Sequence, residues 1–446
     1  MDDGRSEFPW HQVRRALPWL HIFAAFRIAL DIRKMLLAAV ALMLLAEGDW
    51  LISQLPFAPE TAEFDHEADW PSQQTTGFGD PLTMPSRFVD DPTGVLFEIV
   101  SSWKVVLRPV RDLAEPLLVL FRADVSLSSF AHAWTKLLWM LLVWALFGGA
   151  VTRMSAVQFA RDEHLGMRAA LKFSASKFVS YVTAPLFALA GISLFWLICF
   201  AAGVVGRIPF AGDAIVGGTL IVSLVFGLIM SLILVGGAAG WPMMYAAISA
   251  EGSDAFDGFS RPYSYVFGRT WQYAWNVLVA LVYGSISIFF VTFMATLVVY
   301  LTGWAISSGM GADHSSALFW ATPALFGGRE MFAGLSSGDV TVGSGLAGMW
   351  LHFVSLLVIG FVYSYFWTAS TLIYFLLRLG DDATELDEVY IPEEEQEEDS
   401  LLPLVGVAGS MQPVVERPLD GDAAAPESSA PETGASNADA DGGDKD

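Results

Sequence analysis

Six long apolar runs constrain this chain more than any other feature of its sequence. Each is close to or above the roughly 20 residues that a helix needs to cross a bilayer core about 30 Å thick. In hydrocarbon, every backbone N–H and C=O group must be paired within the segment, so these runs predict helices. The runs extend over about Met35–Phe57, Trp134–Thr152, Val182–Gly206, Ala214–Ala239, Asn276–Leu301 and Met349–Leu377.

The low charge content supports the same class of protein. Charged residues make up 16% of the chain, whereas about a quarter is typical of soluble domains. We therefore predict an all-α fold, a polytopic membrane bundle of about six transmembrane helices. It is expected to have three parts: an N-terminal segment with an interfacial helix, a six-span membrane domain and an acidic tail. These parts are predicted to cover 1–34, 35–380 and 381–446.

Lys and Arg concentrate in the short loops on one side of the predicted spans. The segments before the first span, between the second and third, and between the fourth and fifth are basic, and Arg378 follows the sixth. The short loops of the opposite side contain only Arg207 and Arg329. Because cytoplasmic loops carry an excess of Lys and Arg, we expect both termini to face the cytoplasm. The predicted location is the inner membrane of a bacterium.

Three stretches with apolar residues at helical spacing precede the odd-numbered spans on the basic side. They cover 17–33, 165–182 and 254–275. Helices of this kind lie in the membrane interface, with the apolar face in the acyl region and the basic face toward anionic headgroups. The residues expected to contact lipid headgroups are Arg27, Arg33, Lys34, Arg168, Lys172 and Lys177.

A faint internal repeat links the inner ends of the second and fourth spans. FGGAVTRMSAVQFARDE (147–163) aligns with VGGAAGWPMMYAAISAE (235–251), sharing Gly-Gly-Ala and a final Glu. The pattern predicts three hairpin units, each made of an interfacial helix, a span out and a span back. The alternative is that any inward-going helix ends in small residues followed by charge. Small residues allow close helix packing in lipid, and the positions expected to do so are Gly148, Gly149, Gly236 and Gly240.

The loop between the first two spans, 58–133, is predicted to lie on the outer side. Residues 96–121 within it have the spacing of an amphipathic helix, kinked near Pro109 and Pro116. Two placements are open for this helix: on the outer leaflet, or packed over the spans.

The acidic charge of the chain is concentrated at its C-terminal end. Residues 1–380 carry a net charge of −5, and residues 381–446 one of −18. Low hydrophobicity with high like charge cannot supply a core, so we expect a disordered cytoplasmic tail. Two roles are open for it: docking of a basic protein partner, or a solubilising appendage.

Two carboxylates, Glu47 and Asp49, interrupt the first predicted span. At about 1.5 Å per residue they lie roughly 18–21 Å from its start at Met35, in the outer third of the bilayer core. Ionised groups at such depth usually pair, face a cavity or mark a pathway. Lys136, in the first outer turn of the second span, is the expected partner, above all of Asp49. The alternative is that the span ends early and both acids meet water.

The sequence contains no Ser/His/Asp order, P-loop or HExxH motif typical of an enzyme. A single cysteine, Cys199, can form neither an internal disulfide nor a thiolate metal site. We therefore predict a protein that is not an enzyme and that has no cofactor, metal ion or nucleic-acid partner.

Three segments carry a resemblance to known families: GGAVTRMSAVQFARDE, SRPYSYVFGRTWQYAW and LLRLGDDATELDEVY. Over most of residues 10–395 they resemble a family of uncharacterised polytopic membrane proteins of planctomycete-type bacteria. The plan of interfacial helix plus span also resembles the Yip1-like and glycerophosphodiester phosphodiesterase membrane-domain families. Both are membrane modules without a catalytic domain, so the resemblance implies no functional residue.

Two functions follow as hypotheses. The first is a non-enzymatic membrane-organising or accessory protein, whose interfacial helices bind anionic lipids and whose tail binds a protein partner. The alternative is a transporter or channel for a small solute or lipid, with the charges of the first two spans in its path.

Overall fold

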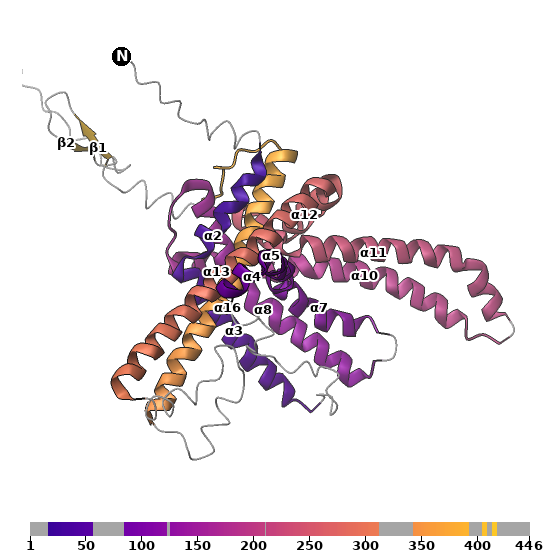
Figure 1. Ribbon diagram of the computed structural model, residues 1–446. Coiled ribbons are helices and arrows are strands. Elements are labelled where there is room, and N and C mark those ends of the chain that lie inside the picture. Colours follow the sequence, from indigo (N-terminus) through magenta and orange to yellow (C-terminus); the bar gives the residue numbers. More distant parts are fainter. Residues whose placement is uncertain are drawn as a thin grey trace, which may run out of the picture. The chain divides into compact units, whose positions relative to one another are not determined.

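Figure 1 shows the computed structural model of the chain. The chain divides into two compact units, Met1–Tyr390 and Ile391–Asp446. The predicted N-terminal segment before residue 17, part of the outer loop and most of the predicted tail lie outside the described residues. The structure describes 17–56, 84–122, 125–209, 211–311, 342–391, 404–407 and 413–416.

Six helices of the first unit are long and apolar enough to cross a membrane, which confirms the predicted all-helical multi-pass class. α8, α11, α13 and α16 each have 35 to 41 residues, about twice the length that a bilayer core requires. Part of each therefore extends beyond the hydrocarbon. The six helices are α3 (Ile32–Ser53), α8 (Leu127–Arg161), α10 (Phe178–Val205), α11 (Gly212–Glu251), α13 (Thr270–Met310) and α16 (Val342–Asp381).

Short helices lie before the first, third and fifth of these helices, within the stretches expected to be amphipathic. In α12, the Asp254 side chain accepts hydrogen bonds from the backbone N–H groups of Phe256 and Asp257. It thereby pairs donors that the first turn of a helix leaves open. The short helices are η1 (Pro18–Phe23), α2 (Ala24–Ala29), α9 (Met167–Ser176) and α12 (Ala255–Gly268).

The described part of the predicted outer loop is helical and packs against the spanning helices. α5 and α6 contact α13, and α7 contacts α8. A single helix kinked near Pro109 and Pro116 was expected over 96–121. The structure has three helices here, interrupted at Ser102 and at Leu107, two residues before Pro109, whereas Pro116 lies inside α7. Pro109 lies in the first turn of α7, where its missing N–H would be unpaired anyway. The helices are α4 (Met84–Asp90), α5 (Pro92–Ser101), α6 (Trp103–Val106) and α7 (Arg108–Leu120).

Spanning helices that are neighbours in sequence pack together. α3 packs against α8, α10 against α11 and α13 against α16. Figure 1 shows α10 and α11 side by side, projecting from the rest of the first unit. In addition, α8, α11 and α16 each contact both of the others, while α9 packs on α8, α12 on α11 and α2 on α16. The second helix of each pair thus belongs to a shared centre.

The core lies where α8, α11 and α16 meet. Every residue of α11 from Gly240 to Ala250 is buried, as is every residue of α16 from Val358 to Arg378. Aromatic rings fill this centre: Trp144 of α8 stacks on Tyr363 of α16 with ring centroids 5.2 Å apart. Packing of this kind adds directional ring contacts to simple area burial.

The second unit contains a described pair of strands. β1 (Leu404–Val407) and β2 (Pro413–Glu416) pair antiparallel. The region expected to be a disordered tail therefore has some regular structure. The first unit ends at Tyr390, beyond the boundary predicted at residue 380.

Candidate functional site

The structure places the expected ion pair of the first two spans together. Lys136 Nζ of α8 lies 3.9 Å from Asp49 Oδ2 of α3, and Glu115 Oε2 of α7 lies 3.9 Å from the same nitrogen. The Lys136 side chain is 21% exposed and the Asp49 side chain 48% exposed. The pair is therefore at the edge of the packed protein rather than inside it. Glu47 is exposed on α3 and has no ion-pair partner among the described residues.

Asp112 of α7 joins this cluster, and the sequence analysis missed it. It accepts a hydrogen bond from the hydroxyl of Tyr363 on α16. Desolvation raises the pKa of the Asp112 carboxyl above its ordinary value, although the Arg108 guanidinium, the Tyr363 bond and Arg111 oppose the rise. The available signal was its spacing three residues before Glu115. The two carboxylates share one helix face, which is turned toward α8 and α16.

The prediction that Lys34 contacts lipid headgroups is wrong. The side chain is fully buried, and its Nζ donates to Ile28 O at 2.9 Å and to Gln158 Oε1 of α8 at 2.7 Å. The reason is the start of α3: Asp31 is its N-cap and accepts from Arg33 N–H. Lys34 therefore points inward from the first turn, and no carboxylate pairs with its ammonium group at ion-pair distance among the described residues.

The other basic residues predicted to contact headgroups divide into two groups. Lys177 Nζ donates to Gly252 O at 2.5 Å, so it binds the carboxyl end of α11, where a positive charge is favourable. Arg27 is exposed and lies 3.3 Å from Asp162 Oδ1. Also exposed are Arg33, Arg168 and Lys172.

A buried polar network joins α8, α10 and α11 around Ser249. Its hydroxyl lies 2.6 Å from Thr152 Oγ1 and 2.7 Å from Tyr181 Oη, and its carbonyl accepts from Arg153 Nη1 at 2.9 Å. The Arg153 guanidinium also lies 4.3 Å from the centre of the Phe173 ring. Buried polar groups are costly unless paired, so this network fixes one arrangement of the three helices.

A second network surrounds Glu251 at the end of α11. Its carboxylate lies 2.7 Å from Arg261 Nη1 and 3.9 Å from Arg378 Nη1, and it accepts from Tyr374 Oη at 2.5 Å. Burial is the largest single influence on the pKa of Arg261 and lowers it, but Glu251 together with Tyr374, Tyr265 and Asp257 raises it more, so the net shift is upward. Arg378 also donates to Glu388 O at 3.1 Å. The network therefore links the ends of α11, α12 and α16 to the segment after α16.

That segment, 382–390, lies along the ends of α11 and α12 and is called the strap below. Tyr390 N–H donates to Ala250 O at 2.7 Å, and its ring lies against Gly252. Asp382 accepts from the Tyr265 hydroxyl. These residues were expected to belong to the tail because of their acidic composition. The aromatic and apolar residues of LDEVY were the signal for packing.

Two of the predicted packing glycines lie in α8 beside bulky neighbours. A methyl group added at Gly148 would lie 3.0 Å from the Trp367 ring of α16. At Gly149 it would meet the Ser174 hydroxyl and lie 2.9 Å from the Tyr181 ring. Both positions therefore allow other helices to approach α8 closely.

The other two packing glycines lie in α11 and face α12. A methyl group at Gly236 would lie 2.5 Å from the Tyr263 ring, and one at Gly240 would lie 3.5 Å from Pro262 Cβ. Gly236 is therefore in close contact, whereas Gly240 has room for a methyl group. At Gly360 of α16, which was not predicted, the added carbon would meet backbone rather than a side chain, with Met35 O at 2.6 Å.

Together these features define a multi-pass helical membrane protein with buried polar networks on one side of its spans. Within the described residues, no group of three or more His, Cys, Asp or Glu side chains could hold a metal ion. Comparison with protein-family models, with curated proteins and with solved structures finds no match for this chain.

Proposed function

We propose that this chain is a non-enzymatic membrane-organising or accessory protein. One contrast in burial carries the proposal. The centre where α8, α11 and α16 meet is closely packed and contains buried hydrogen bonds. By contrast, in the most apolar 18-residue stretches of α10 and α11, only 11% and 6% of the residues are buried. Spans that share packing at one end and face lipid at the other offer surface to lipid and partners.

In this proposal the three helix pairs are three hairpin units, each beginning with an interfacial helix, in the bacterial inner membrane with both termini in the cytoplasm. The positions of α2, α9 and α12 before α3, α10 and α13 support it. So does the packing of each on the second helix of the preceding pair, with α2 on α16 closing the ring. The exposed side chains of Arg33 and Arg168 then supply contacts to anionic headgroups.

The strap gives the tail a fixed starting point. Because Tyr390 and Glu388 are bound to the ends of α11 and α16, a partner held by residues beyond 391 would be kept close to the membrane surface. An acidic segment of this charge suits a basic partner.

Native mass spectrometry on protein extracted directly into lipid nanodiscs tests the proposal. Full-length protein is compared with a chain ending at Pro392, which keeps the strap. A second variant keeps the length of the tail but replaces the acidic residues of 393–399 by Gln and Asn, which tests the charge alone. We expect a stoichiometric protein partner that is lost in both variants. A partner-free full-length protein would contradict the accessory function.

The cluster of Asp49, Glu115 and Lys136 favours a second function, transport of a small solute or lipid. Charges within or beside spans often mark a pathway. In proteoliposomes, transport requires that Asp49→Asn abolishes flux of the solute while the thermal unfolding temperature is unchanged. The accessory function requires that this substitution alters stability only and leaves partner binding intact.

A further inference from the structure

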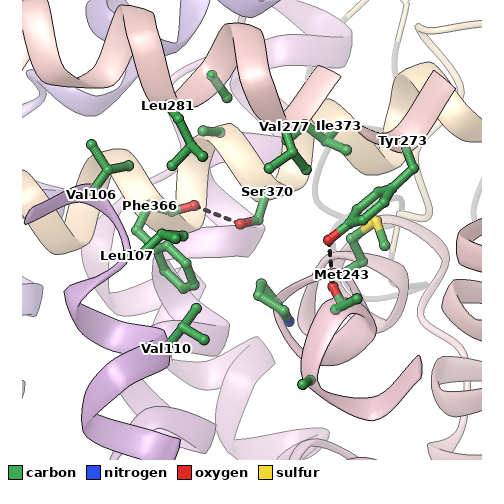
Figure 2. Close-up of a pocket in the computed structure, with 15 residues that line it drawn as sticks. Val106, Leu107, Val110, Met243, Tyr273, Val277, Leu281, Phe366, Ser370 and Ile373 are labelled. Carbon is green, nitrogen blue, oxygen red and sulfur yellow. Dashed lines mark hydrogen bonds between the residues drawn. The ribbon is translucent and has the colours of Figure 1, made fainter. Parts of the chain in front are cut away.

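A cavity of about 220 Å³ lies between α11 and α13, and none of its lining residues belongs to the ion-pair cluster or to the two polar networks. Figure 2 shows its lining side chains, which come from α6, α7, α11, α13 and α16. Phe366, Ala369 and Ile373 of α16 are buried and form its floor, whereas Ala238 of α11 is exposed and Val277 of α13 half-buried. Ala238 is the one exposed residue of the lining, so we place the opening of the cavity beside α11, on the side where α13 also lines it.

The lining offers almost nothing to a polar ligand. Its two polar side chains are already paired: Tyr273 Oη donates to Ala239 O at 3.0 Å, and Ser370 Oγ donates to Phe366 O at 2.8 Å. Both bonds are drawn in Figure 2. An ordered water needs two to four polar partners, and an apolar cavity of about 150 Å³ in another protein stays dry and takes up benzene. The chemistry therefore selects hydrocarbon over water or a charged solute.

The position of the cavity along the spanning helices indicates which part of a lipid could reach it. Its mouth is formed by two of the membrane-spanning helices. At the start of α13, Trp271 is 89% exposed and Trp275 49% exposed, and exposed tryptophans of this kind lie at the level of lipid headgroups. Tyr273 is in the same turn, and Leu281 lies about 12 Å further along at ~1.5 Å per residue. The cavity thus begins just below the headgroups and extends to acyl-chain depth.

We propose that this cavity holds one acyl chain of a phospholipid, which enters from the leaflet on the side of the α12–α13 junction. The acyl chain fills the space that the side chains of α11 and α13 leave open between them. Tyr273 bridges the two helices at the headgroup end, and the chain fills the space beneath it. This site goes beyond the proposed accessory function and does not depend on a protein partner.

The test uses full-length protein in nanodiscs of phosphatidylcholine that carries a diazirine on one acyl chain. After photolysis, the labelled residues are mapped by peptide mass spectrometry. We expect labels at Val277, Leu281 and Met243 to exceed those at exposed positions of α10 and α11 at least threefold. Even labelling over all exposed faces would overturn the proposal.

Two variants sharpen the result. Ala239→Trp obstructs the mouth from a half-buried position, and Ala369→Leu fills the floor. Each is expected to lower labelling of the cavity residues to the level of the exposed faces. The matched control, Leu224→Trp, places the same ring on the lipid-facing part of α11, where Leu224 is 60% exposed, and leaves cavity labelling unchanged. Unchanged labelling in Ala239→Trp would also overturn the proposal.

Ala369→Leu is a substitution in the core, so the mouth variant and the wild-type map decide the matter if it does not fold. Retention of a tail partner in native mass spectra is measured on the same samples. If cavity labelling fails while the partner is retained, only the lipid site is contradicted. If the partner is absent while cavity labelling is seen, only the accessory function is contradicted.

Discussion

The most apolar 18-residue stretches, or windows, of α8 and α11 relate hydropathy to burial in the opposite way from a soluble protein, in which the more apolar segment is the more buried one. The α11 window has the higher mean hydropathy, 2.6, and 6% of its residues are buried, whereas the α8 window has 1.7 and 72%. Lipid tails are as apolar as leucine, so apolarity does not drive helices together in a bilayer. Small and polar residues do so by close packing and hydrogen bonds. The more apolar window therefore faces lipid, and the less apolar one belongs to the centre.

The largest expected change in stability comes from replacing a glycine of the packed centre by alanine. The same replacement in the lipid-facing part serves as the comparison. In Gly360→Ala the new methyl carbon would lie 2.6 Å from the Met35 carbonyl oxygen of α3. Because backbone must move to make room, we expect a loss of about 2–3 kcal/mol in the free energy of unfolding. Thermal unfolding in nanodiscs measures it.

The control for that substitution is Gly227→Ala in α11, where an added methyl group has no neighbour within 4 Å. Removing backbone freedom without a clash is expected to be neutral or to stabilise the helix by up to about 1 kcal/mol. Equal losses for both variants would contradict the division into a packed centre and a lipid-facing part.

The next effect concerns the buried ammonium group of Lys34. Gln158→Leu removes one of its two hydrogen-bond acceptors and leaves a buried charge partly unpaired. We expect a loss of about 1.5–3 kcal/mol, typical of a hydrogen bond to a charged group. Arg33→Ala, one residue away and exposed, is expected to change stability by less than about 0.5 kcal/mol. Similar values for the two variants would show that Lys34 is hydrated.

A pH effect of intermediate size is expected from Asp112. Its pKa is raised in the folded protein, chiefly by desolvation, so the folded state binds the proton more tightly than the unfolded state does. This contribution to stability is complete below the unfolded pKa of about 4 and is lost as pH rises through the folded pKa. Unfolding temperatures measured across this range should fall with rising pH.

The matched variant for the pH series is Asp112→Asn, which keeps an acceptor for the Tyr363 hydroxyl but cannot ionise. The difference in stability between variant and wild type should grow in favour of the variant as pH rises above about 4. A constant difference over the whole series would show that Asp112 does not titrate with a raised pKa.

The smallest effect is expected at the surface. Arg27 and Asp162 pair at 3.3 Å with side chains 72% and 79% exposed. Exposed pairs contribute little, so Arg27→Ala should lower the free energy of unfolding by less than about 0.5 kcal/mol. Thermal unfolding at low and high salt checks this. A loss comparable with that of Gln158→Leu would mean that the pair is shielded, for example by lipid headgroups.

The sequence was sufficient to predict the six spans, because apolar runs are a direct consequence of the bilayer. It did not predict where the helices end. α11 was expected over 214–239 but continues to Glu251, because beyond the apolar run the helix is stabilised by packing on α8, α12 and α16 instead of by lipid. Hydropathy does not report such packing.

The charged residues were harder to place, for a related reason. Asp49 and Lys136 could be paired by counting residues along two adjacent helices. Lys34 and Asp112 could not, because their partners, Gln158 and Tyr363, are far away in sequence and are polar without being charged. An uncharged partner in another helix leaves no charge pattern to detect.

The pair formed by α10 and α11 projects from the first unit and has few buried residues in its apolar part. Each of these two helices also contains an internal proline, Pro185 in α10 and Pro242 in α11, near the point where the pair meets the rest of the protein. Proline removes a helical hydrogen bond and permits bending there. The other four spanning helices contain none. We therefore expect any bending of this pair to be concentrated at its base, where a change of tilt with bilayer thickness would leave the network at Ser249 in place.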